Sequence, residues 1–267
     1  MSLGFGVTST IDLDLVQRIA PAVEQAGCAF FWSNDIPGGS SFDVLAAAAG
    51  MTRELSLANG VVPIERVPPA EWPARIEQVG LLGDRFWPGI GSGGIRHPIE
   101  QMRAAIDEIR DLTGRPVIIG ALRTNMRRLA AERADGVLLN WLTPEAAASR
   151  RDEMRSVRAA AGNDRPFMTA AFIRVAIGGA AIARLHHEAD KYEGFPSYTK
   201  HFAEMGVGAF DTAVAAQSAE EAADGLLPFL DVLDHAVLRC VVGEETEAAY
   251  LQLVQAGRLA VERHGGM

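Results

Sequence analysis

Two neighbouring polar residues, Asn34 and Asp35, end the second apolar segment of the chain and are candidates for catalysis. A carboxylate at such a place could act as a general base, or hydrogen-bond a ligand, provided that burial keeps its pKa in a working range. Asn-Asp-Ile-Pro is equally a good turn sequence, because Asn and Asp tolerate turn geometry and proline fixes it. Both interpretations, a reactive pair and a plain turn, remain open at this point.

A glycine-rich segment, Gly89-Ile90-Gly91-Ser92-Gly93, follows the fourth apolar segment. Glycines there would leave backbone N–H groups exposed, with no side chains to block a planar ring or an anion. The spacing is not the dinucleotide-binding fingerprint, which needs G-x-G-x-x-G running into a helix and an acidic residue about 20 positions on. A tight turn that needs positive φ is the alternative.

The cysteines and histidines form no metal-binding motif. Cys28 and Cys240 lie in apolar segments without CxxC spacing, so we expect two reduced, buried thiols. His186 and His187 are adjacent on an expected helix and point to different faces, which argues against a shared metal ion. His201 has no identifiable acidic partner. We therefore expect no metal site.

Short apolar segments rich in β-branched and aromatic residues alternate with longer amphipathic ones, which indicates βα units and a parallel sheet. Eight such segments are present, the number that closes a (β/α)₈ barrel. The expected strands are 3–9, 28–35, 55–62, 86–91, 116–121, 136–141, 167–175 and 236–242.

Local signals place several helix boundaries. Asp12 suits the start of the first helix, since negative charge complements the helix dipole there. Thr143-Pro144-Glu145 predicts an N-cap followed by proline at the first helical position, with the helix running to about Ala161. Order is weaker across 176–235, where glycines and Pro196 break the pattern, so an insertion or lid is expected in that region.

The bulk composition favours one domain spanning 1–267. The chain has 267 residues, is 48% hydrophobic and carries a formal net charge of −9. That charge argues against nucleic acid or an anionic membrane as a partner and favours a small-molecule substrate. No stretch reaches the roughly 20 apolar residues of a membrane span, and the N-terminus lacks a signal pattern. We expect a cytoplasmic protein.

Several stretches, in order, resemble the luciferase-like monooxygenase superfamily and, within it, the branch that uses the deazaflavin coenzyme F420. They are 29–35 with 42–49, 57–63, 89–93, 116–122, 126–141 and, more loosely, 198–206. The resemblance implies a single luciferase-like (β/α)₈ TIM barrel and hydride transfer between F420 and a small organic substrate. An FMN-dependent monooxygenase is the alternative. A non-catalytic or degenerate flavin-binding barrel is the second alternative.

The resemblance also implies site residues. At Asn59-Gly60-Val61 the family places a non-prolyl cis peptide against the cofactor ring, and Gly91 and Ser92 lie beside it. The strand ends at Ala121-Leu122-Arg123 and Asn140-Trp141 are implied to hold the cofactor phosphate. The usual Gly-Pro-Lys-Met after the fifth strand is replaced here by residues 123–126, which weakens the phosphate assignment. Either Arg123 or the following Thr124 supplies the missing phosphate contacts, or Arg123 is a solvated loop residue; both interpretations remain open. Family members pair through helices near the second and third strands, which implies a homodimer.

Overall fold

The computed structural model describes residues 1–81 and 83–266, in which strands and helices alternate along the chain. The strands are β1 (Ser2–Thr8), β2 (Phe30–Asn34), β3 (Ser56–Asn59), β4 (Val62–Pro63), β5 (Phe86–Trp87), β6 (Gly89–Gly91), β7 (Ile118–Gly120), β8 (Gly136–Asn140), β9 (Met168–Ile177), β10 (Val214–Ala216) and β11 (His235–Val241). The α-helices are α1 (Leu13–Gln25), α2 (Ser41–Met51), α3 (Trp72–Gln78), α4 (Ile99–Thr113), α5 (Thr124–Arg133), α6 (Pro144–Ala160), α7 (Gly179–Glu193), α8 (Pro196–Met205), α9 (Ala219–Val232) and α10 (Glu247–Gly265).

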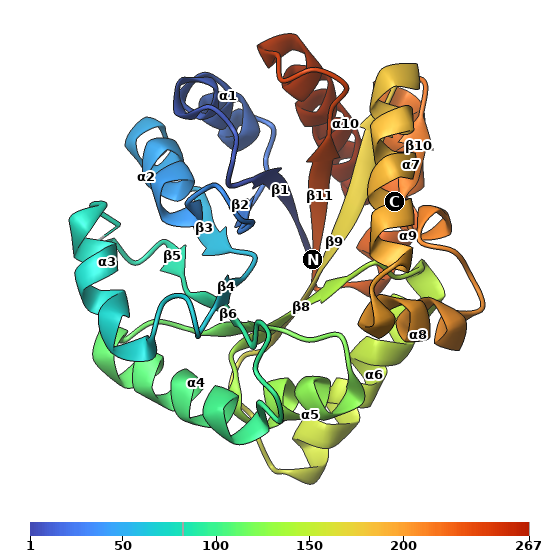
Figure 1. Cartoon of the computed structure of the whole chain (residues 1–267). Helices are drawn as coiled ribbons and strands as arrows, with labels where there is room; N and C mark the ends of the chain where they lie inside the picture. Colours follow the sequence, from blue (N-terminus) through green and yellow to red (C-terminus); the bar gives the residue numbers. More distant parts are fainter. Residues whose placement is uncertain (82, 267) are drawn as a thin grey trace.

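The strands form a parallel barrel with the helices outside it (Figure 1). The ladder runs from β6 through β7, β8, β9 and β11 to β1, β2 and β3. The barrel closes because β3 pairs with β5 while β4 pairs with β6. These two ladders are the halves of one contact between the third and fourth barrel strands. The predicted (β/α)₈ barrel is therefore confirmed.

All eight expected strands are present, with two differences in detail. The expected strands 55–62 and 86–91 are each divided in two, at Gly60-Val61 and at Pro88. Proline has no N–H to donate to a ladder, which explains the second break. The short strand β10, which pairs with β9, was not expected, since three residues are too few to show a period.

Side chains alternate between the inside of the barrel and the helix layer, as strand geometry requires. The inner cluster includes Trp32, Leu138, Phe172 and Val237, whereas their sequence neighbours pack against the helices. Towards the amino ends of the strands, buried His235 accepts a hydrogen bond from Trp32 Nε1 at 3.0 Å. Side chains therefore fill the interior of the barrel below the rim. In barrels of this kind, ligands bind at the carboxyl ends of the strands.

Helix ends follow the predicted signals. Asp12 caps α1 through the N–H of Leu15, and Thr143 caps α6 through the N–H of Ala146. The region 176–235 holds α7, α8, β10 and α9, with α7 lying beside β9 and α8 packed against α7 (Figure 1). Among the described residues, no helix is long and apolar enough to cross a membrane.

Candidate functional site

The carboxyl ends of the strands bring several predicted site residues to one rim of the barrel. Asn34, at the end of β2, donates from Nδ2 to the carbonyl oxygen of Gly60 at 2.8 Å. Gly60 follows β3 and is joined to Val61 by a cis peptide bond, as expected. Parallel strands all point the same way, so residues that end them meet here. We take this rim as the candidate site.

A surface built of backbone lies beside Val61 on the fourth and fifth barrel strands. A Cβ atom added at Gly91 would lie 2.7 Å from Val61 Cγ2, and one added at Gly120 would lie 2.9 Å from the same atom. Neither position therefore accepts a side chain without displacing Val61. The half-buried Val61 side chain therefore packs over two glycines, which gives the rim a low apolar surface at this place.

The glycine-rich segment after β6 is a tight turn. The N–H of Gly94 donates to the carboxylate of Glu65 at 2.9 Å, and the N–H of Ile95 donates to the Ser92 carbonyl at 3.2 Å. Gly93 has φ +54°, in the left-handed region that favours glycine. The Glu65 carboxylate takes the place that an external anion would need at Gly94. Ser92 is half-buried beside the rim, and its cofactor role stays a prediction.

Asp35 and Asn34 face different surroundings. The side chain of Asp35 is 2% exposed and forms an ion pair with Arg66. Its other carboxylate oxygen accepts from the backbone N–H of Ser41 at 3.2 Å, at the start of α2. This is the environment of a carboxylate that fixes a loop. The catalytic role predicted for Asp35 would require release from Arg66, whereas Asn34 reaches the rim directly.

Asn59 points away from the rim. Its side chain is fully buried, and Nδ2 donates to Ser41 Oγ at 2.7 Å on the helix side of the sheet. Any contact of Asn59 with a ligand at the rim would therefore have to come from its backbone. Its side chain instead ties β3 to α2.

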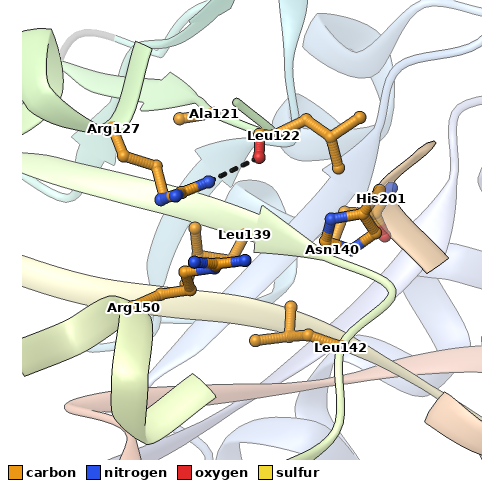
Figure 2. Close-up of a pocket in the computed structure, with 8 residues that line it drawn as sticks. All are labelled: Ala121, Leu122, Arg127, Leu139, Asn140, Leu142, Arg150 and His201. Atoms are coloured by element: carbon orange, nitrogen blue, oxygen red, sulfur yellow. Dashed lines mark hydrogen bonds between the residues drawn. The ribbon is translucent and has the colours of Figure 1, made fainter. Parts of the chain in front are cut away.

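A small cavity lies where β7 and β8 end, at the place predicted for the cofactor phosphate (Figure 2). Its volume is about 10 Å³, close to the space that one water molecule needs. The residues that line it are Ala121, Leu122, Arg127, Leu139, Asn140, Leu142, Arg150 and His201. Two arginines lie beside the predicted Ala121 and Leu122, and the carboxylates of Glu153 and Glu204 pair with them.

The two arginines differ in how fully they are engaged. Arg127 is 2% exposed, donates to the Leu122 carbonyl at 2.7 Å and pairs with Glu153 at 2.9 Å. Burial, followed by the charge of nearby Arg150, lowers the pKa of the Arg127 guanidinium. Arg150 lies 3.9 Å from Glu153, and its buried Nε has no acceptor among the described residues. Arg150 therefore keeps a donor for a ligand.

His201, from α8, closes the cavity on its other side (Figure 2). Its Nε2 lies 2.6 Å from the carbonyl oxygen of Trp141, so that nitrogen carries the proton and donates. Burial is the main cause that lowers the pKa of this imidazole. His201 is thus a neutral residue that holds α8 against the end of β8.

Arg123 and Thr124 are exposed and lie outside the cavity lining. The arginine at this end of the barrel that reaches the strand-five loop is Arg127, one helical turn further on. Sequence reasoning passed over Arg127, although it lies three and four residues before the buried Ala130 and Ala131 on the same face of α5. The phosphate contact predicted for Arg123 stays a prediction.

Asn140 and Trp141 end β8 and are held by side chains from β9 and α8. Asn140 donates from Nδ2 to Tyr198 Oη at 3.0 Å and accepts from Arg174 Nη1 at 2.5 Å. Trp141 is 1% exposed and has φ +53°. The Arg174 guanidinium carbon lies 3.6 Å from the centre of its ring. Burial raises the pKa of Tyr198 to about 12, so its hydroxyl stays protonated near neutral pH.

Comparison with known proteins identifies a family and related sequences. Residues 108–259 match the family described as luciferase-like monooxygenase. The 5,10-methylenetetrahydromethanopterin reductase of Archaeoglobus fulgidus is 28% identical over 212 residues, which cover 65% of this chain and 64% of that protein. The chain therefore spans less than two thirds of the length of this relative.

Two solved structures share the fold along almost the whole chain. Coenzyme F420-dependent tetrahydromethanopterin reductase from Methanopyrus kandleri has a TM-score of 0.71 and 15% identity, over 98% of this chain and 99% of that one. An F420-dependent secondary alcohol dehydrogenase in complex with an F420-acetone adduct has a TM-score of 0.78 and 13% identity, over 97% and 98%. At such identities the likeness establishes the fold alone.

Proposed function

Because the chain belongs to the luciferase-like monooxygenase family, which matches more than half of its length, we propose that it transfers a hydride between coenzyme F420 and a small organic substrate. The sequence similarity to a methylenetetrahydromethanopterin reductase supports this choice of cofactor, because a tetrahydromethanopterin reductase of the same fold is F420-dependent.

The observation that carries the proposal is the backbone surface formed by Gly91 and Gly120 beside Val61. A Cβ at either glycine would collide with Val61, so the two glycines leave the small Val61 side chain to cover this part of the rim. A flat, largely apolar ring fits such a surface, and the residues present therefore suit a flavin or a deazaflavin. When bound, a deazaflavin supplies a ring carbon that takes or gives a hydride.

The side chains at the rim would orient the cofactor, bind its phosphate and exclude water. Asn34 is fixed on the Gly60 carbonyl and presents a polar side chain beside the proposed ring surface. Beside the cavity at Ala121 and Leu122, Arg150 keeps an Nε donor that would be offered to the phosphate of the cofactor. Helix α7 packs against β9 and β11, where it would keep water from the substrate.

An FMN-dependent monooxygenase is the second candidate, favoured by the description of the matched family. The same backbone surface suits an isoalloxazine ring equally well. Fluorescence titration of the purified protein with F420 and, separately, with FMN distinguishes the two. Tight binding of F420 alone supports the proposal, and tight binding of FMN alone moves the function to oxygen chemistry. Binding of neither contradicts both and favours a degenerate barrel.

Replacing Gly91 by alanine tests the surface itself. The new methyl group must displace Val61, at a cost of about 1–3 kcal/mol, so we expect F420 affinity to fall about tenfold or more. Gly265→Ala is the matched control, because a Cβ there meets no atom within 4 Å. Equal affinities of wild type and Gly91→Ala in the fluorescence titration, with both proteins folded by circular dichroism, would refute the assigned surface.

A further inference from the structure

Two arginines lie side by side inside the barrel rim, on its seventh and eighth strands. Arg174 of β9 pairs in register with Arg239 of β11, and they are 1% and 6% exposed. Phe172 and Val237, two residues earlier on the same strands, belong to the inner cluster. Because side chains alternate along a strand, both guanidinium groups are on the inner face, one layer nearer the rim.

One carboxylate serves both arginines. Glu188 of α7 accepts from Arg174 Nε at 2.9 Å and lies 3.2 Å from Arg239 Nη1. The other acceptors are neutral, namely the Asn140 side-chain oxygen and the Cys240 carbonyl oxygen. Burial alone would raise the pKa of Glu188, but the two arginines lower it, so the carboxylate is ionised. Arginine also stays charged in proteins, which leaves these three side chains with a net charge of about +1.

Two donors of this cluster have no acceptor. Among the described residues, Arg174 Nη2 and Arg239 Nε are buried and make no hydrogen bond. Buried charged donors without acceptors are costly, and native structures rarely leave them so. The aromatic rings of Trp141 and Tyr192 lie 3.6 and 5.1 Å from the Arg174 guanidinium carbon. These walls exclude water, which strengthens the attraction of the cluster for an anion.

The cluster lies across the rim from the proposed ring surface. Gly60, Gly91 and Ala121 follow or end the third, fourth and fifth barrel strands, whereas Arg174 and Arg239 lie on the seventh and eighth. An anion bound here would therefore face the cofactor ring, where a substrate would lie. Arg174 also contacts Asn140, which lines the cavity beside Ala121, so competition with F420 is part of the test below.

We propose that Arg174 and Arg239 bind an oxyanion of the substrate, a carboxylate or a phosphate, and that the enzyme therefore acts on an anionic small molecule. That the bound anion is part of a substrate rests on the proposed function. The anion site itself can be tested without any cofactor. Glu188 then sets the affinity of the site, because it neutralises one of the two arginines that face the ligand.

The test measures anion binding to the cofactor-free protein. Inorganic phosphate and acetate are titrated at constant ionic strength, with chloride as the reference anion, and tryptophan fluorescence is followed because Trp141 stacks on Arg174. Thermal unfolding in the same solutions provides a second readout. Preference for phosphate or for acetate identifies the kind of oxyanion.

Three variants are expected to change the dissociation constant of the anion in different ways. Arg239→Gln removes a charge and a donor, so we expect the dissociation constant of the preferred anion to rise about tenfold or more. Glu188→Gln removes the competing carboxylate, so we expect that constant to fall several-fold. Arg18→Gln is the charge-matched control, because its side chain is 51% exposed on α1 and pairs with Glu247, and we expect no change.

Several results would overturn the proposal. They are equal anion affinity in wild type and Arg239→Gln, weaker anion binding in Glu188→Gln, or competition between F420 and the anion, which would assign the site to the cofactor. If Arg239→Gln does not fold, Arg239→Lys keeps the charge, and Glu188→Gln still provides the opposite sign. Failure of the F420 titration would contradict the proposed function and leave the anion measurement unaffected.

Discussion

At the scale of single residues, neighbours in the sequence have unrelated roles. Asn34 and Asp35 looked like one candidate pair, yet one reaches the Gly60 carbonyl at the rim and the other pairs with Arg66. Alternation along β2 and the turn after it separates them. Arg66 lies far along the sequence from Asp35, so no local pattern could reveal that the carboxylate is engaged.

His235 shows the same dependence on distant partners. It is fully buried at the base of the barrel, where Trp32 Nε1 donates to Nε2, so Nδ1 carries the proton towards Ser2 Oγ at 2.7 Å. Burial, followed by the N-terminal ammonium group, lowers the pKa of His235 to about 3. Gly4 makes room for the ring, since a Cβ there would lie 2.5 Å from His235 Nε2.

The lowered pKa of His235 predicts that the free energy of unfolding decreases in acid. Its folded-state pKa is below the value of 6.5 expected when unfolded, so its contribution is complete above pH 6.5 and is lost as pH falls towards 3. Between pH 7 and about pH 4.5 that loss is about 2–3 kcal/mol. We expect His235→Gln to be less stable at pH 7 and to lose less free energy of unfolding over this range.

Urea unfolding at the two pH values measures this difference. His187→Gln is the control, because His187 is exposed on α7. The same pH dependence in wild type and His235→Gln would contradict the assignment of the acid sensitivity to His235.

At the scale of elements, helix α6 is the best example of a locally encoded segment. The predicted N-cap, Thr143, accepts from the N–H of Ala146 at 3.3 Å, Pro144 takes the first helical position, and the helix ends at Ala160. Such signals act within one turn of the chain, so the sequence contains them completely.

Removing this cap tests its contribution. We expect Thr143→Ala to lower the free energy of unfolding by about 1 kcal/mol, because an N–H at the start of α6 loses its side-chain acceptor. Thr143→Ser keeps a hydroxyl and should stay within a few tenths of a kcal/mol of wild type. The midpoint of urea unfolding is the measurement, and equal midpoints for Ala and Ser would argue against the cap.

At the scale of the whole molecule, α2 has an outer surface without charge beyond its first turn. Ala46 and Ala47 are partly buried against the core, Gly50 is exposed, and Met51 is 47% exposed. An apolar helix face of this kind is typical of a protein interface. The homodimer expected near the second and third strands stays a prediction, and α2 is the surface on which we place it.

Light scattering after size-exclusion chromatography tests the dimer. We expect wild type to elute as a dimer and Gly50→Arg as a monomer, because a charge placed in an apolar interface cannot be paired, and a Cβ at Gly50 meets no other part of its own chain within 4 Å. Ala104→Arg, on the exposed side of α4, is the matched control and should remain dimeric. A wild-type monomer, or a dimeric Gly50→Arg protein, would contradict the placement.

Much of the fold could be predicted from sequence, and less of the site. Periodicity predicted the eight strands and the barrel, and the resemblance alone implied the cis bond at Gly60-Val61. The charged pair Arg174 and Arg239 was missed, although each interrupts an apolar strand, which is itself a signal of a polar interior. Asn59 was expected at the rim, but its side chain lies on the helix side of the sheet.

The sequence by itself determined what depends on residues close together in the chain: which segments are strands, where α1 and α6 begin, and that the strands suffice to close a barrel. Only the tertiary structure decided which side chains meet. Glu188 comes between Arg174 and Arg239 because α7 returns along the ends of β9 and β11, and Asp35 lies against Arg66 because the loop after β4 returns to β2. Electrostatic partnership depends on distance in space, and the sequence specifies distance only along the chain.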